Sequence, residues 1–151
     1  MFRKIMIGDK ETDFKCSAAT SILYKRLFGR SLTDDMGKLA AVSQKATAIN
    51  RKLLALREDS EDNQNEIIEL LASDSSITEM ASMTQEIVPQ MAYIMWLEGK
   101  KPQRELFREL TDDGFVLWLS GFDPNDLINS ASEFFELWNG TNKTNSNLKN
   151  V

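Results

Sequence analysis

The sequence predicts a mainly α-helical protein that begins with a β-hairpin and ends in a disordered polar tail. Three observations support this fold class. Only three prolines and seven glycines occur among 151 residues, which favours helix over sheet because both residue types interrupt regular structure. Apolar and polar residues alternate strictly in residues 11–16, as they do in a strand. Many of the other apolar residues recur at steps of three and four, which is the period of an amphipathic helix.

Residues 1–16 are predicted to form the hairpin. The Gly8–Asp9 pair lies between two strand-like runs and is typical of a two-residue turn, because glycine supplies the positive φ that such a turn needs. This turn places Ile5 opposite Thr12, on an apolar face. An isolated two-stranded hairpin is only marginally stable in water. Its apolar face is therefore expected to lie on a helix, or its edges to pair with another copy.

A bundle of about five to six helices is predicted to follow. Gly29 is a natural C-terminal cap for the first helix. Asp123 caps the last helix, which is predicted to run unbroken to Trp138, and Pro124 fits its first turn. Helical segments are expected over residues 18–28, 66–72, 76–97, 103–110, 111–121 and 123–138, with a solvated loop over 58–65. A further helix is expected to begin at a cap formed by Ser31 or Thr33 and to run through Leu56.

Residues 1–138 are predicted to form a single domain and residues 139–151 a flexible polar tail. The tail consists almost wholly of Asn, Thr, Lys, Gly and Ser, which resist both helix and core. Such a segment either links the folded body to another molecule or is a frayed terminus without a role.

Composition places the chain among cytoplasmic proteins without a membrane span. No run approaches the roughly 20 apolar residues that cross a bilayer, and the N-terminus lacks the apolar core of a signal peptide. Cys16 is the only cysteine, so an internal disulfide is impossible and an intracellular protein is expected.

Charge is segregated along the chain. Residues 1–57 hold twelve basic and five acidic residues, whereas residues 58–99 hold ten acidic residues and no basic one. Helices that pair through opposite charges explain this pattern. A head-to-tail oligomer, or steering of a charged partner, explains it as well.

The sequence offers little for catalysis, a metal or another cofactor. It contains no histidine, which is the commonest general base and metal ligand, and its glycines stand singly. The paired acids at positions 34/35, 112/113 and 123/126 fall at predicted helix starts, where they stabilise the positive end of the helix. Cys16 lies in an alternating strand and is expected to be a core residue. The acidic residues at 58–62 lack the glycine and ligand spacing of a calcium loop. No enzyme is predicted.

Nucleic-acid binding is a weaker hypothesis. Basic residues cluster at 25–30 and again at 51–57, and phosphates attract such charge. The acidic segment 58–99 would repel DNA, and the aromatic residues beside the first cluster lie at core spacing. The chain is therefore expected to bind neither nucleic acid nor membrane.

Binding to protein remains. A stripe of apolar residues recurs at steps of three or four along one predicted helix and is either core or an adaptable binding surface, because the unbranched methionine side chain repacks against varied partners. We take the second interpretation as the hypothesis and add two aromatic residues of the last helix. The candidate partner-binding residues are Met80, Met83, Ile87, Met91, Met95, Phe134 and Trp138.

Three segments carry a resemblance to a known family. Tyr24-x-x-x-Phe28-Gly29-Arg30-Ser31-Leu32, the hydrophobic Ala92–Met95 and the Leu137–Trp138 pair followed by an Asn/Thr/Lys-rich tail occur in this order. Together they resemble the tail assembly chaperones of long-tailed, siphovirus-like phages and prophages of Gram-positive bacteria. Residues 40–76 depart from the pattern, because they are longer and more acidic than the family leads us to expect.

The resemblance implies a function. Such chaperones coat the aggregation-prone tape measure protein, keep it soluble and recruit tail tube subunits. Several copies act together in the host cytoplasm, and none stays in the mature virion. The alternatives are a small virion structural protein, such as a tail completion or connector subunit, and a DNA-binding regulator.

Overall fold

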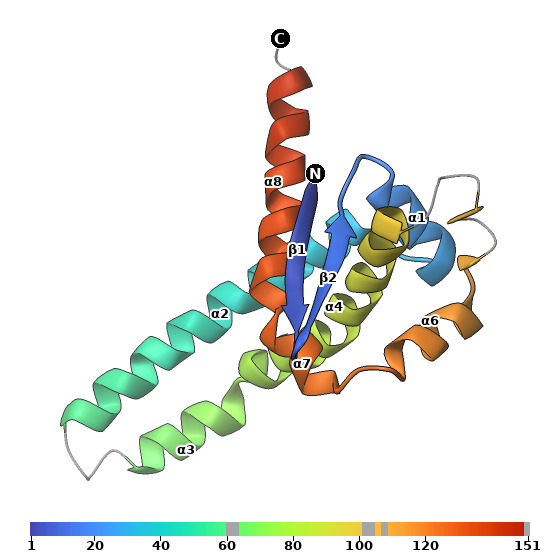
Figure 1. The fold of residues 1–151 in the computed structure, drawn as a ribbon. Coiled ribbons are helices and arrows are strands. Elements are labelled where there is room, and N and C mark those ends of the chain that lie inside the picture. Colours follow the sequence, from blue (N-terminus) through green and yellow to red (C-terminus); the bar gives the residue numbers. More distant parts are fainter. Residues whose placement is uncertain (60–63, 101–104, 107–108, 150–151) are drawn as a thin grey trace. The chain divides into compact units, whose positions relative to one another are not determined.

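The computed structural model describes residues 1–59, 64–100, 105–106 and 109–149. Within these residues the chain forms a two-stranded antiparallel hairpin followed by helices, which confirms the predicted fold class (Figure 1). The elements are β1 (Phe2–Ile7), β2 (Lys10–Lys15), α1 (Thr20–Phe28), α2 (Leu32–Asp59), α3 (Gln64–Ser73), α4 (Ser76–Lys100), α6 (Asp112–Leu119), α7 (Pro124–Asn129) and α8 (Ala131–Lys149). Half of the predicted loop over 58–65 (residues 60–63) and half of the predicted helix over 103–110 (residues 103, 104, 107 and 108) lie outside the described residues. The two ends of the predicted loop, 58–59 and 64–65, belong to α2 and α3 instead.

The chain divides into two compact units, where the sequence predicts a single domain. The first unit comprises Met1–Asp34 and Gln85–Val151, and the second comprises Asp35–Thr84. Helix α4 contributes its first turns to the second unit and its remainder to the first. None of the helices in the described part of the chain is long and apolar enough to cross a membrane.

The hairpin has the predicted register. Ile5 lies opposite Thr12, and Gly8 takes the positive φ of 63° that the turn requires. Its apolar face lies on a helix, as expected: Phe14 and Phe134 of α8 are both fully buried and meet edge to face, with ring centroids 4.9 Å apart. Arg3 reinforces this contact by donating a hydrogen bond of 2.7 Å to Glu136. The hairpin is thereby fixed to the C-terminal helix.

The predicted last helix is broken into α7 and α8 at Ser130, which corrects the unbroken helix expected from the periodicity. Asp123 caps α7 as predicted, accepting a hydrogen bond of 2.9 Å from the N–H of Asn125. The Ser130 hydroxyl donates to the Met6 carbonyl of β1 at 2.9 Å, and the Ser130 carbonyl accepts from the Glu133 N–H at 3.0 Å. The break therefore joins the start of α8 to the hairpin, a contact that helical periodicity does not encode.

Helix α8 continues to Lys149, through the segment for which the sequence predicts a tail (Figure 1). Thr141 is only 6% exposed, and its hydroxyl donates to the Leu137 carbonyl at 3.0 Å. A side chain at Gly140 would begin 3.3 Å from the sulfur of Met1. The packed body thus extends three residues beyond the predicted boundary at Trp138, while the flexibility of the remaining tail stays a prediction.

The second unit contains most of α2, all of α3 and the first turns of α4. Its long helix α2 buries a stripe at alternating steps of three and four residues: Leu39, Val42, Ala46, Ile49 and Leu53. Asp74 accepts a hydrogen bond of 2.7 Å from the N–H of Ser76 at the start of α4. Hydrogen bonding from Ser76, together with the positive charges of Lys45 and Lys52 on α2, lowers the pKa of Asp74. Lysines of α2 thus favour the charged form of Asp74, while the explanation of the charge pattern along the chain stays a prediction.

Candidate functional site

Five of the seven predicted partner-binding residues are buried in the first unit. These are Ile87, Met91, Met95, Phe134 and Trp138, none more than 5% exposed. A side chain without exposed surface cannot meet a partner unless the fold opens, so these residues form core instead of the predicted binding surface. Periodicity identified the correct face of each helix but not what covers that face. Met80 and Met83 lie in the second unit and are half-buried.

The motif that begins at Tyr24 fixes α1 against α4. Gly29 ends α1 with a φ of 74° and donates its N–H to the Lys25 carbonyl at 2.9 Å. This left-handed residue turns the chain so that Arg30 points back, donating to the Tyr24 hydroxyl at 3.2 Å and to Gln90 Oε1 at 2.5 Å. The Tyr24 hydroxyl itself donates to the same Gln90 oxygen at 3.0 Å. The three side chains form one network between α1 and α4.

The same motif connects α1 to α6 through aromatic rings. Phe28 meets Phe115 of α6 with ring centroids 5.2 Å apart, and Phe115 meets Tyr93 of α4 at 5.4 Å. Tyr93 contacts both Trp96 and Trp118, at 6.0 and 5.4 Å, and these two indoles lie 5.8 Å apart. We call Tyr93, Trp96 and Trp118 the aromatic trio. It belongs to a continuous chain of ring contacts that holds α6 beside α4 and runs on from Trp118 to Phe122.

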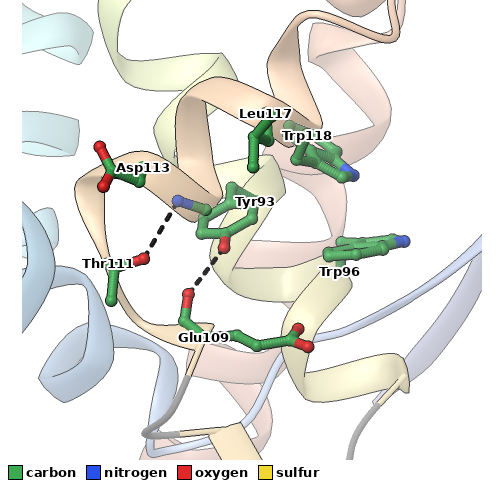
Figure 2. A pocket seen from close by; sticks show the side chains of 8 residues that line it. Tyr93, Trp96, Glu109, Thr111, Asp113, Leu117 and Trp118 are labelled. Carbon is green, nitrogen blue, oxygen red and sulfur yellow. Dashed lines mark hydrogen bonds between the residues drawn. The ribbon is translucent and has the colours of Figure 1, made fainter.

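The aromatic trio lines a pocket of about 500 Å³ between α4 and α6. This volume lies within the range of pockets that bind small molecules. Figure 2 shows Trp96 and Trp118 together at one end and Thr111 with Asp113 at the other. The lining residues in the described part of the chain are Tyr93, Trp96, Glu109, Thr111, Asp113, Gly114, Leu117 and Trp118.

Two hydrogen bonds shape this pocket. The Tyr93 hydroxyl donates to the Glu109 carbonyl at 2.8 Å, and Thr111 caps α6 by accepting from the Gly114 N–H at 3.0 Å (Figure 2). Gly114 is required here, because a Cβ at this position would lie 2.6 Å from the Tyr93 hydroxyl and 2.9 Å from the Glu109 carbonyl. The lack of a side chain therefore lets α6 approach the tyrosine.

The electrostatic character of the pocket is acidic. Glu109 and Asp113 contribute carboxylates, and none of the described lining residues is basic. Burial, and secondarily the negative charge of Glu109, raises the pKa of Tyr93, so the hydroxyl stays protonated and remains a hydrogen-bond donor. The indole Nε1 of Trp118 is buried without an acceptor among the described residues.

Two successive residues of α6 are apolar and exposed, and one of them lines the pocket; we call this pair the apolar ridge. Val116 is 62% exposed and Leu117, which also lines the pocket, is 74% exposed. The sequence had indicated a short aromatic helix here, yet its periodicity could not show that two apolar side chains would face solvent. Trp96 and Glu109 were missed altogether, because no local pattern connects them to α6.

A second polar cluster is buried beneath the start of α1. Glu98 is 8% exposed and accepts hydrogen bonds from the Ser17 hydroxyl at 2.6 Å and the Thr20 hydroxyl at 2.5 Å. Burial raises the pKa of Glu98, and burial likewise raises the pKa of the nearby Cys16 thiol. A reactive cysteine needs a lowered pKa, so Cys16 has the core role expected from its strand.

Within the described residues, no group of three or more acidic or cysteine side chains is placed to hold a metal ion. Comparison of the chain with known protein families, curated proteins and solved structures finds no match. The candidate site is therefore defined by its own geometry, as an aromatic, acidic pocket beside the exposed side chains of Val116 and Leu117 on α6.

Proposed function

We propose that this protein is a tail assembly chaperone of a long-tailed phage or prophage of Gram-positive bacteria. It binds the tape measure protein, keeps it soluble and helps recruit tail tube subunits, with several copies acting together on one client. It works by binding and catalyses no reaction.

The observation that carries this proposal is the apolar ridge of Val116 and Leu117 beside the aromatic pocket. Adjoining exposed apolar side chains are a feature of protein-binding surfaces. A tape measure protein is a long amphipathic helical chain, and such a helix can lay its apolar face against a short ridge with an adjoining pocket.

The segment at residues 24–32, which carries the family resemblance, packs against the elements that form the ridge and the pocket. Tyr24, Phe28 and Arg30 are the residues that join α1 to α4 and α6. They hold in place the helix that bears the ridge. The motif at the end of α1 therefore packs against the helix that carries the candidate surface, although the two segments lie far apart in the sequence.

Client solubility tests the proposal. Purified protein is mixed with its proposed client, a tape measure protein, and turbidity is followed at increasing ratios. We expect aggregation to be suppressed by the wild type and by Ile22→Asp, which changes another exposed apolar residue, on α1 and outside the pocket. Leu117→Asp should lose most of the suppression.

Two outcomes would count against the proposal. A client that aggregates equally fast with and without the wild-type protein removes the chaperone function. Mass spectrometry of purified virions provides the second check, because a chaperone leaves the particle whereas a tail completion or connector subunit remains in it. Stoichiometric amounts in the virion would favour that structural role.

A further inference from the structure

The pocket of the aromatic trio combines two features that together select a ligand class. Three ring systems form its wall, and aromatic faces carry negative electrostatic potential that attracts cations. Two carboxylates, Glu109 and Asp113, add negative charge to the same cavity. In Figure 2 the Glu109 carboxylate lies on the Trp96 side of the pocket, whereas Asp113 lies at the opposite end.

The protein already places a cation on one of these rings. Nζ of Lys100 lies 4.5 Å from the centroid of Trp96, within the distance at which a cation–π interaction is significant. The contact is made by an exposed side chain one helical turn further along α4. The Trp96 ring is therefore placed to contact a cation, and Lys100 is a positive charge beside the pocket that an incoming cation would displace.

An anionic ligand fits the pocket poorly. The N-terminus of α6 reaches the cavity at Thr111 and Gly114, and helix N-termini attract anions. Here, however, Thr111 occupies the N–H of Gly114, and Asp112 and Asp113 supply the negative charge for the first turn. A phosphate or carboxylate would meet the negative charge of Asp113, which lines the cavity, so the charge favours a cation.

The ridge indicates that the cation belongs to a polypeptide. A small free cation would occupy the cavity and leave Val116 and Leu117 in water. An amphipathic helix with a basic residue one turn from its apolar residues would cover the ridge and fill the pocket together, since residues three or four apart share a face. Arginine suits the site better than lysine, because its planar guanidinium stacks on aromatic rings and forms paired hydrogen bonds with carboxylates.

We propose that the pocket lined by the aromatic trio, Glu109 and Asp113 receives an arginine side chain from an amphipathic helix of the protein partner. This inference rests on the proposed function, since it specifies how a client helix is held. It predicts that client segments bound here carry an arginine next to apolar residues.

A helical peptide tests this directly on the full-length protein. The probe is a designed amphipathic 18-residue peptide with one central arginine on its apolar edge, compared with versions carrying lysine or glutamine at that position. Binding is followed by tryptophan fluorescence, since two of the three tryptophans line the pocket, and by calorimetry at two salt concentrations. We expect the glutamine peptide to bind about fivefold to tenfold more weakly than the arginine peptide, with lysine between them and the difference smaller at high salt.

A matched pair of variants assigns the effect to the pocket. Asp113→Asn and Asp112→Asn remove the same charge from the same turn of α6, but only Asp113 lines the cavity. Asp113→Asn should weaken the arginine peptide about threefold or more, and Asp112→Asn less than twofold. The double variant Glu109→Gln with Asp113→Asn should bind the two peptides with more similar affinities than the wild type does, leaving only the preference that the aromatic rings supply.

Two results would overturn the inference. If the arginine and glutamine peptides bind wild type equally, the pocket has no preference for a cation. If neither binds, the pocket is not a helix site. In both cases suppression of client aggregation by the wild-type protein would leave the proposed function standing, so the two failures are distinguishable.

Discussion

The carboxyl group of Glu98 offers the sharpest test of the fold, because it is buried with two hydroxyl donors and no basic side chain bonded to it in the described part of the chain. Glu98→Ala leaves the hydroxyls of Ser17 and Thr20 without their acceptor. A buried polar group that loses its partner costs about 1–3 kcal/mol. Thr20 is fully buried, whereas Ser17 is half-buried and can turn to water, so the free energy of unfolding should fall by about 1–4 kcal/mol. At about 2–4 °C per kcal/mol for a chain of this size, the melting temperature should drop by about 2–16 °C.

Glu98→Gln separates the charge from the hydrogen bonds. The amide keeps an acceptor oxygen and offers an NH₂ group to which one hydroxyl can turn its lone pair, so both Ser17 and Thr20 retain partners. No charge needs to be buried in this variant. At pH 7 we therefore expect its stability to lie within about 1 kcal/mol of the wild type, or above it.

The pH dependence of stability shows whether ionisation of Glu98 stabilises or destabilises the folded state. Burial raises the pKa of Glu98 above its ordinary value of 4.5, against the opposing effect of its hydrogen bonds, Lys15 and the N-terminal ammonium. The folded state then holds the proton more tightly than the unfolded state, so this group stabilises the fold fully below pH 4.5. That contribution is lost as the pH rises through the folded-state pKa. Wild type should therefore lose stability relative to Glu98→Gln with rising pH.

Thermal unfolding followed by circular dichroism between pH 4.5 and 8 measures this difference, because effects of other titrating groups cancel between the two proteins. The reasoning would be refuted if the glutamine variant were as unstable as the alanine variant at pH 7. It would equally be refuted if the stability of the wild type rose relative to that of the glutamine variant as the pH increased.

Three further predictions concern the backbone, the core and the tail. Gly29→Ala should lower the free energy of unfolding, measured with urea, by about 1–2 kcal/mol, because the φ of 74° at this position is left-handed. Gly37 lies within helix α2 with open space around it, so Gly37→Ala should raise the free energy of unfolding by up to about 1 kcal/mol. Phe134→Ala should lose about 3–5 kcal/mol and release the hairpin in hydrogen exchange, whereas the half-buried Phe135→Ala should lose less than half as much. Truncation after Thr141 should leave the melting temperature nearly unchanged, while removal of Thr141 as well should lower it, since this residue is buried; equal melting temperatures for the two truncations would contradict this.

Features with local causes were predictable. The turn at Gly8 and the alternation after it determine the hairpin register, and Gly29 and Asp123 end and begin helices through bonds to their immediate neighbours. Each of these signals involves residues a few positions apart, so the chain encodes them without reference to the rest of the fold.

The assignment of the methionine stripe shows the limit of such signals. The steps of three and four correctly placed Met91 and Met95 on one face of α4, but a binding face and a buried face have the same period. Which of the two is realised depends on the elements that pack there. In this fold that face is core, whereas Val116 and Leu117 of α6 remain exposed.

By itself, the sequence determined the helical class, the hairpin with its register and the positions of several helix ends. Only the tertiary structure decided that Ser130 breaks the last helix to bond Met6, that Glu98 lies beneath α1, and that Trp96 and Trp118 enclose one pocket. The physical reason is that these contacts join residues distant along the chain. Their energy arises when whole elements pack together and leaves no periodic trace in the sequence.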